Sequence, residues 1–205
     1  MRILRSKSDA ILVGKNTVEQ DDPLLTVRYA KGKNPIRIIL DSHGIIKNNS
    51  RIIKTCKHVP TIIVTSEIIS KPNLNRLRKL PIDVIICGKN QVNLTKLLPI
   101  LLKKGIKTIL LEGGGTLNRS FLQKNLIDEM IIALTPYVLG SKNTVSLFEG
   151  MSFPELLQEL KRMRVQMKYS REIQKESELL DAEYHQIVKM QKRGELTLFD
   201  FPESK

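Results

Sequence analysis

Blocks of apolar and polar residues alternate along this chain and predict strands and helices in turn. Short apolar runs that are rich in β-branched residues and end in glycine or a small polar residue are typical of buried strands. They occur at residues 8–14, 34–42, 60–66, 81–88, 106–115 and 130–140. Helical spacing occurs at residues 73–80, 94–102 and 116–126. Strands that are apolar on both faces and alternate with helices predict an α/β fold, with a mixed, mostly parallel sheet flanked by helices.

The clearest helix signal is a set of five leucines from Leu94 to Leu102. They recur at the spacing of one helix face. Asn93 is a candidate N-cap and Gly105 a C-terminal stop. Pro99 removes one hydrogen bond of this helix.

The pattern changes after Gly140. Residues 165–173 and 182–190 predict two alternating, partly exposed antiparallel strands, and a helix over 155–181 is the alternative. We expect one domain over residues 1–192, followed by a tail at 193–205.

Composition sets the broad class of the protein. The chain has 205 residues, of which 41% are hydrophobic, enough for a sizeable core. We find no apolar run near the roughly 20 residues that a membrane span needs. The two cysteines, Cys56 and Cys87, form neither a disulfide framework nor a zinc-ligand spacing. We therefore expect a cytoplasmic protein without a membrane partner.

The formal net charge of +13 falls in residues 1–150, because residues 151–205 hold as many acidic as basic side chains. A basic body suits an anionic partner, either a phosphorylated small molecule or a nucleic acid. The scattered lysines also fit a proteome that is simply rich in isoleucine and lysine. The chain has four Tyr, five Phe and no Trp, too few for stacking on single strands, which argues against nucleic acid.

A glycine-rich motif lies at the end of one predicted strand. Glu112 is followed by Gly113, Gly114, Gly115 and Thr116, and then by a helical pattern. Bare backbone N–H groups at a helix start are suited to a pyrophosphate. The motif is neither the GxGxxG fingerprint nor a Walker loop. A tight strand-to-helix connection without a ligand is the alternative.

A second motif, GKNTVEQDDPLLTVR, spans residues 14–28. Thr17 and Asp21 lie four residues apart, so a helical turn places them on one face. Asp22-Pro23 then breaks the helix, and Arg28 follows on an extended segment. A hydroxyl, a carboxylate and a guanidinium together suit a phosphorylated polyol. Solvated charges on a short helix are the alternative.

In open α/β sheets, ligands bind beyond the carboxyl ends of the strands. The predicted strand ends here are Gly14, Asp41-Ser42, Gly88 and Glu112. We therefore expect both motifs to converge on one nucleotide-sized site.

The segments DAILVGKNTVEQDDPLLTVR, NPIRIILDS, LLEGGGTLNRSFLQKNLIDEM and LTPYVLGS occur here in the order and spacing of the riboflavin-biosynthesis reductase family. The chain resembles the stand-alone 2,5-diamino-6-ribosylamino-4(3H)-pyrimidinone 5′-phosphate reductases. It is equally similar to the C-terminal reductase half of the bifunctional deaminase-reductases. The resemblance covers about residues 1–155, and the block T-V-x-x-D-D-P-x-L-T-V-R is its most specific part.

The resemblance implies a dihydrofolate-reductase-like fold and a homodimer. It implies an oxidoreductase that uses NADPH to reduce the ribosyl side chain of the pyrimidinone phosphate to the ribitylamino form. It places the cofactor against Thr17, Asp21, Asp41, Ser42, Gly113, Gly114, Gly115 and Thr116. It places the substrate against Arg5, Asp21, Leu25, Arg28 and Glu112, with Arg5 and Arg28 near the ribose phosphate. Because hydride adds to an imine carbon, a carboxylate helps by electrostatics or proton delivery, and Asp21 and Glu112 are the catalytic candidates. No metal is needed.

The sequence departs from the family at both ends. The family begins with another strand, and we expect this chain to lack it, so a catalytically impaired, truncated relic that binds a nucleotide or a partner is the alternative function. The zinc deaminase signature is absent, which favours the stand-alone type and the diamino substrate. The peptide ELTLFDF at 195–201 resembles a sliding-clamp-binding motif, with chance similarity as the alternative.

Overall fold

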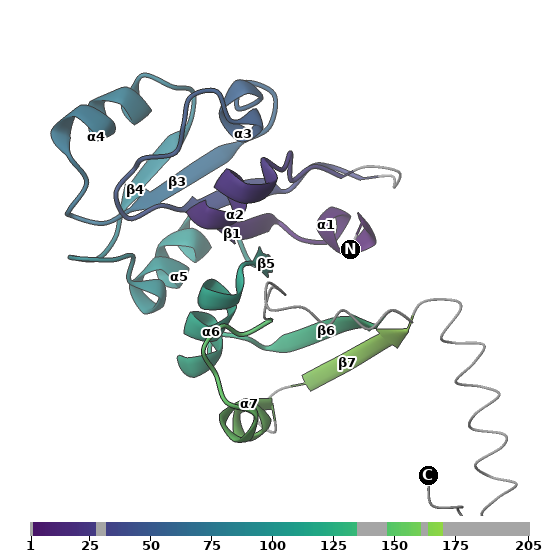
Figure 1. Cartoon of the computed structure of the whole chain (residues 1–205). Coiled ribbons are helices and arrows are strands. Elements are labelled where there is room, and N and C mark those ends of the chain that lie inside the picture. The colour runs from purple at the N-terminus through teal and green to yellow at the C-terminus, as the bar shows by residue number, and fades with distance from the viewer. Residues whose placement is uncertain (1, 28–31, 135–146, 161–163, 170–205) are drawn as a thin grey trace, which may run out of the picture. The chain divides into compact units, whose positions relative to one another are not determined.

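The computed structural model describes residues 2–27, 32–134, 147–160 and 164–169 (Figure 1). The chain divides into two compact units, Met1–Ile127 with Val145–Glu159, and Asp128–Thr144 with Leu160–Lys205. The expected tail at 193–205 and the boundary at residue 192 lie outside the described residues. Among the helices that are described, none is long and apolar enough to cross a membrane.

The first unit contains a five-stranded parallel sheet. Its strands are β1 (Ala10–Gly14), β2 (Ile36–Leu40), β3 (Thr61–Thr65), β4 (Asp83–Ile86) and β5 (Ile109–Gly113). They are arranged in the order β4-β3-β2-β1-β5, and every neighbouring pair is parallel. Each strand lies inside an apolar run that predicts it, so the α/β architecture with a mostly parallel sheet is confirmed.

The helices alternate with these strands. They are α1 (Arg2–Ser6), α2 (Lys15–Asp21), α3 (Arg51–Lys54), α4 (Lys71–Arg78), α5 (Leu94–Lys103), α6 (Gly115–Gln123) and α7 (Phe153–Leu160). The predicted N-cap of α5 is confirmed, because the Asn93 side chain accepts a hydrogen bond from the Lys96 N–H at 3.0 Å. Gly105 follows this helix with φ 84, the left-handed conformation of a helix stop. In α7 the Ser152 N–H and hydroxyl both donate to the Glu155 carboxylate, and these bonds lower the pKa of Glu155.

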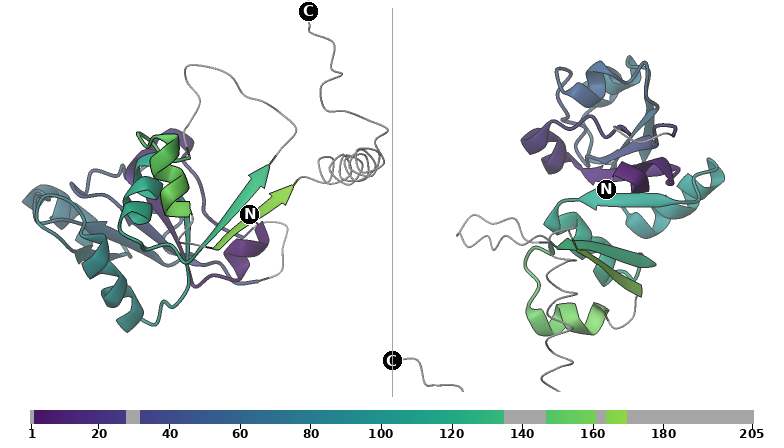
Figure 2. Two further views of the ribbon diagram at one scale, coloured as in Figure 1. Left: turned by 90° about the horizontal axis from the view of Figure 1, so that it is seen from below. Right: turned by 90° about the vertical axis from the view of Figure 1, so that its right-hand side faces the viewer.

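The core has two layers because alternate residues of each strand face opposite sides of the sheet. From β1, Ala10 and Leu12 face a cluster that includes three leucines of α5, at positions 94, 97 and 101, and Phe121 of α6. Ile11 and Val13 face a second cluster with residues from α2, α3 and α4. Helices therefore cover both faces of the sheet, as Figures 1 and 2 show.

An exposed carboxylate ties the start of β1 to the segment before β5. The Asp9 carboxylate accepts hydrogen bonds from the N–H groups of Lys107 and Thr108 at 2.9 and 2.8 Å, and from the Thr108 hydroxyl at 3.0 Å. The two backbone bonds are the main reason that the pKa of Asp9 lies below its ordinary value of 3.8.

The second unit contains β6 (Glu129–Leu134) and β7 (Arg164–Tyr169), which pair in parallel. Each begins one residue before a segment that predicts a strand, 130–140 for β6 and 165–173 for β7, and β6 is described only to Leu134. The helical alternative over 155–181 is wrong for residues 164–169, which form β7. The antiparallel partner that we expect at 182–190 lies outside the described residues.

Candidate active site

The order of the strands gives the sheet one switch point. β2, β3 and β4 follow one another on one side of β1, whereas β5 lies on its other side. The loops that leave β1 and β5 therefore run in opposite directions at the carboxyl edge of the sheet. Ligands of open α/β sheets bind at such a point. Here the chain leaves β1 into α2 and leaves β5 into α6.

The two sequence motifs meet at this switch point. The Thr17 hydroxyl, in the first half of α2, donates to the Gly113 carbonyl at the end of β5 at 3.3 Å. Gly114 has φ 87, and a Cβ atom on it would lie 3.1 Å from the Thr17 hydroxyl oxygen. Glycine at this position therefore permits both the left-handed backbone and the close approach to α2. The expected convergence of the motifs holds for Thr17 and the glycines.

The start of α6 leaves backbone donors available. Ser70 caps α4 and Asn93 caps α5 through their side chains, whereas no side chain caps α6 at Gly114. The first backbone bonds to the Gly114 carbonyl come from the N–H groups of Leu117 and Asn118, each at 3.0 Å. The N–H groups of residues 115 and 116 therefore have no acceptor within the helix. Such a helix start favours an anion.

A carboxylate that no sequence pattern indicates also lies at the start of α6. The Thr116 hydroxyl donates to the Glu149 carboxylate. Asn118 donates to the Leu147 carbonyl at 3.0 Å, and Arg119 to the Glu149 carbonyl at 3.3 Å. The segment 147–150 is thus fastened to α6, and it brings a negative charge to the predicted phosphate end.

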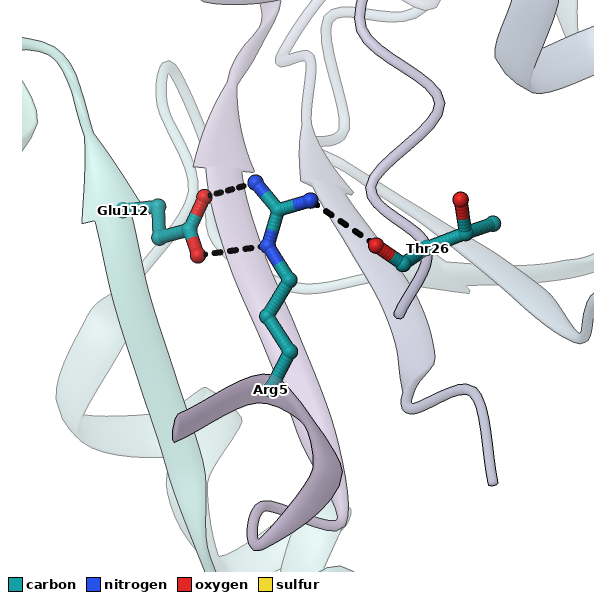
Figure 3. A network of polar contacts seen from close by, with 3 residues as sticks. All are labelled: Arg5, Thr26 and Glu112. Atoms are coloured by element: carbon teal, nitrogen blue, oxygen red, sulfur yellow. Dashed lines mark hydrogen bonds and ion pairs between the residues drawn. The ribbon is translucent and has the colours of Figure 1, made fainter. Parts of the chain in front are cut away.

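Arg5 and Glu112 form a bidentate ion pair (Figure 3). The Arg5 Nε donates to Glu112 Oε1 at 2.8 Å, and Nη2 donates to Oε2 at 2.6 Å. Nη1 donates to the Thr26 carbonyl at 3.0 Å. The side chains of Arg5 and Glu112 are 18% and 8% exposed, and the bonds to Glu112 raise the pKa of Arg5. One guanidinium therefore joins α1, β5 and the segment after α2.

That segment, residues 22–27, has an unusual backbone. Asp22 and Leu25 have φ values of 38 and 52, the left-handed region that non-glycine residues rarely adopt. Leu25 is 2% exposed and packs in the second core cluster, so its side chain lies in the core. Asp21 is exposed at the end of α2. Arg28 lies outside the described residues.

Asp41 and Ser42 hold loops at the same carboxyl edge, directly after β2. The Asp41 carboxylate is buried and accepts from the Ile46 N–H at 2.7 Å. The Ser42 hydroxyl accepts from the Val92 N–H at 3.3 Å, and its carbonyl accepts from the Ser66 hydroxyl at 3.0 Å. Both predicted cofactor residues thus have structural bonds of their own, one strand away from β1.

The family described as RibD C-terminal domain matches residues 1–176. This chain belongs to the RibD C-terminal domain family. The predicted relation to the riboflavin-biosynthesis reductases is confirmed, and with it the dihydrofolate-reductase-like fold.

Curated relatives of the family share much of the sequence. A protein of Aquifex aeolicus is 40% identical over 153 residues, which cover 75% of this chain and 68% of the relative. A protein of Archaeoglobus fulgidus is 34% identical over 173 residues, which cover 80% of this chain and 75% of the relative. Both carry the name 2,5-diamino-6-ribosylamino-4(3H)-pyrimidinone 5′-phosphate reductase.

Solved RibD structures support the same assignment. Two crystal forms of Acinetobacter baumannii RibD are 27% identical to this chain, with TM-scores of 0.59 and 0.60. In each, the similarity covers 74% of this chain and 41% of the RibD chain. In this chain, the Thr17–Gly113 contact and the Arg5–Glu112 pair lie on that fold.

Proposed function

We propose that this chain is an NADPH-dependent reductase of riboflavin biosynthesis. It reduces the ribosyl side chain of 2,5-diamino-6-ribosylamino-4(3H)-pyrimidinone 5′-phosphate to the ribitylamino form. The observation that carries the proposal is the meeting of Thr17 with the Gly113–Gly114 turn at the switch point of the sheet. The relatives named as this reductase point to the same reaction.

The residues present fit a dinucleotide phosphate. The uncapped start of α6 offers two N–H groups, and Gly114 leaves the turn without a side chain. We assign cofactor contacts to Thr17, Asp21, Asp41, Ser42 and residues 113–116. The bound nicotinamide supplies the hydride. This chain supplies the donors that hold the phosphates and the shape that orients the ring.

The substrate side is assigned to Arg5, Asp21, Leu25, Arg28 and Glu112, with the two arginines toward the ribose phosphate. Hydride adds to C1′ of the ring-opened imine, and a proton must reach its nitrogen to give the secondary amine. Both Glu112 oxygens accept from the Arg5 guanidinium, whereas Asp21 is exposed at the end of α2. Asp21 is therefore the better candidate for the carboxylate that assists the reaction by electrostatics or proton delivery, and Glu112 holds Arg5 in place.

We place the enzyme in the cytoplasm as a homodimer, following the resemblance to its family. The clamp-like peptide at 195–201 lies outside the described residues and adds no function to this proposal.

The test is to mix the full chain with NADPH and the ribosylaminopyrimidinone phosphate and follow absorbance of the reduced nicotinamide. Mass spectrometry of the product should show the gain of two hydrogen atoms. Asp21→Asn should lower turnover far more than it weakens NADPH binding, because the amide keeps the size and hydrogen-bonding capacity of the side chain but not the carboxylate. Binding of NADPH without turnover by the folded chain would instead support the relic, and failure to bind either reactant would overturn both.

A further inference from the structure

We infer that Arg37, which is not among the residues assigned above, is a positioning residue for the substrate segment 22–27. This inference rests on the proposed function, because that function makes the segment part of the substrate site. The structural basis is a hydrogen-bond network that reaches the segment through the Leu24 carbonyl.

Arg37 is a charged residue in the middle of the sheet. It is the second residue of β2, between Ile11 on β1 and Thr61 on β3, and it is 0% exposed. It lies on the same face of β2 as Ile39, toward the second core cluster. Burial of a guanidinium is unfavourable unless its donors are satisfied. Burial lowers the pKa of Arg37 to about 10, so the side chain is still a cation at neutral pH.

All three nitrogens of the guanidinium donate to neutral acceptors. Nε and Nη2 donate to the Thr61 hydroxyl at 3.1 and 2.7 Å. Nη2 also donates to the carbonyls of Ile52 and Val59 at 3.0 and 3.1 Å. Nη1 donates to the Thr55 hydroxyl at 2.8 Å and to the Leu24 carbonyl at 3.3 Å.

The acceptors are themselves oriented. The Thr61 hydroxyl donates to the Val59 carbonyl at 2.9 Å, and the Thr55 hydroxyl donates to the Arg51 carbonyl at 2.7 Å. The Thr55 hydroxyl also lies 3.4 Å from the Ile52 carbonyl. Each hydroxyl therefore presents a lone pair to Arg37. α3, β3 and the guanidinium form a fixed frame, and Leu24 is the point where the substrate segment joins it.

The segment needs such a frame because its backbone is strained. Leu25 is in the left-handed region, which is disfavoured for a residue with a Cβ atom. The carbonyls on either side of it are both held by arginines, Leu24 by Arg37 and Thr26 by Arg5. Arg37 thus fixes one side of the turn whose other side meets the Arg5–Glu112 pair, and Arg28 follows two residues after Thr26.

The experiment uses the full chain with Arg37→Lys, which keeps a cation but loses the planar fork. Loss of one charge-assisted hydrogen bond lowers the equilibrium constant for holding the segment in its native conformation by about tenfold or more. We expect KM for the pyrimidinone phosphate to rise about tenfold or more, with kcat and the KM for NADPH within about threefold. Thr55→Val, which removes the other acceptor of Nη1, should raise the same KM by a smaller factor.

Leu101→Ala is the matched control. Leu101 is fully buried on the opposite face of the sheet, so this variant loses stability without touching the network. It should leave the KM for the phosphate substrate unchanged. An equal rise in KM in Leu101→Ala and Arg37→Lys would overturn the inference, because the effect would then be general destabilisation.

Hydrogen exchange separates this inference from the proposed function. The amides of residues 24–27 should exchange about tenfold faster in Arg37→Lys than in the wild type, and those of α5 should not. If the wild type shows no turnover, the proposed function fails while the exchange data still decide the role of Arg37. If Arg37→Lys does not fold, Thr55→Val decides by the same two measurements. Unchanged exchange and unchanged KM in a folded variant would refute the inference.

Discussion

Glu112→Gln tests whether the Arg5–Glu112 pair holds the substrate side of the site together. The substitution keeps the shape of the side chain and one carbonyl acceptor, but it removes the negative charge and one of the two bonds to Arg5. Arg5 then stays 18% exposed with its Thr26 bond and a neutral partner in place of the carboxylate.

The size of the effect follows from the geometry. A hydrogen bond to a charged group contributes about 1.5–3 kcal/mol when it is covered. Glu112 is 8% exposed and Arg5 18%, so solvent screening removes only part of this energy. We therefore expect Glu112→Gln to lower the free energy of unfolding by about 1.5–3 kcal/mol. For a chain of this length that corresponds to a Tm lower by roughly 3–12 °C.

The assay is a double-mutant cycle with Arg5→Met, read by urea denaturation without substrate. The double variant should be more stable than the sum of the two losses predicts, by about 1–2 kcal/mol. Glu19→Gln is the control, because Glu19 forms an exposed ion pair with Lys15 at 2.7 Å within one helix. Glu19→Gln should lower the free energy of unfolding by less than about 0.5 kcal/mol.

Two results would refute this reasoning. Losses from Arg5→Met and Glu112→Gln that simply add would show that the two side chains are not coupled in solution. If Glu112→Gln lowers the free energy of unfolding no more than Glu19→Gln does, the partly buried Arg5–Glu112 pair stabilises the fold no more than an exposed ion pair.

Three further predictions concern the cofactor end and the edge of the sheet. Gly114→Ala should weaken NADPH binding and lower the free energy of unfolding by about 1–3 kcal/mol. The control is Gly105→Ala, because Gly105 is also left-handed but nothing lies within 4 Å of the added Cβ, so NADPH binding should not change. Equal NADPH affinity in the two variants would contradict the role of the Gly114 turn. Glu149→Gln should lower the KM for NADPH severalfold by removing a carboxylate from the start of α6, while Glu155→Gln at the start of α7 should not. Asp9→Asn should be less stable than the wild type at neutral pH. Because the folded pKa of Asp9 lies below 3.8, its contribution is present above that value and is lost as pH falls through the folded pKa. The difference in free energy of unfolding between the wild type and Asp9→Asn should therefore become smaller in acid. A difference that stays constant in urea titrations from pH 7 to 3 would exclude the carboxylate as its cause.

The elements were predictable where a local pattern determines them. The β-branched runs predict β1 to β5, and leucine spacing with Asn93 predicts α5 together with its cap. α3 was not predicted, because a single turn such as Arg51–Lys54 carries no periodic signal. β7 was predicted only with a helical alternative, since its apolar and polar residues do not decide between the two patterns.

The site was predictable in part for the same reason. Parallel strands bring their carboxyl ends to one edge, so the meeting of Thr17 with Gly113 follows from the fold class. The pairing of Arg5 with Glu112 does not follow from the fold class, because the two residues are 107 positions apart and the local sequence around either one does not indicate the other. Glu149 carries no signal at all. Arg37 interrupts an apolar strand, and nothing in the run NPIRIILDS indicates the carbonyls and hydroxyls that accept from it.

Stability alone gives no reason for an arginine at position 37. An apolar side chain of similar volume in a buried strand is often as stabilising as a buried charge, or more so. Such a residue, however, would have no donor for the Leu24 carbonyl, and the left-handed turn at Leu25 would be held only from the Arg5 side. The buried cation therefore makes sense as the element that keeps a strained substrate segment in one conformation. Hydrogen bonds from all three guanidinium nitrogens to oriented acceptors offset the energetic cost of its burial. The same logic accounts for Gly114, where the left-handed backbone and the approach of Thr17 disfavour a side chain, and for the arginines at 5 and 37, which hold the carbonyls on either side of Leu25.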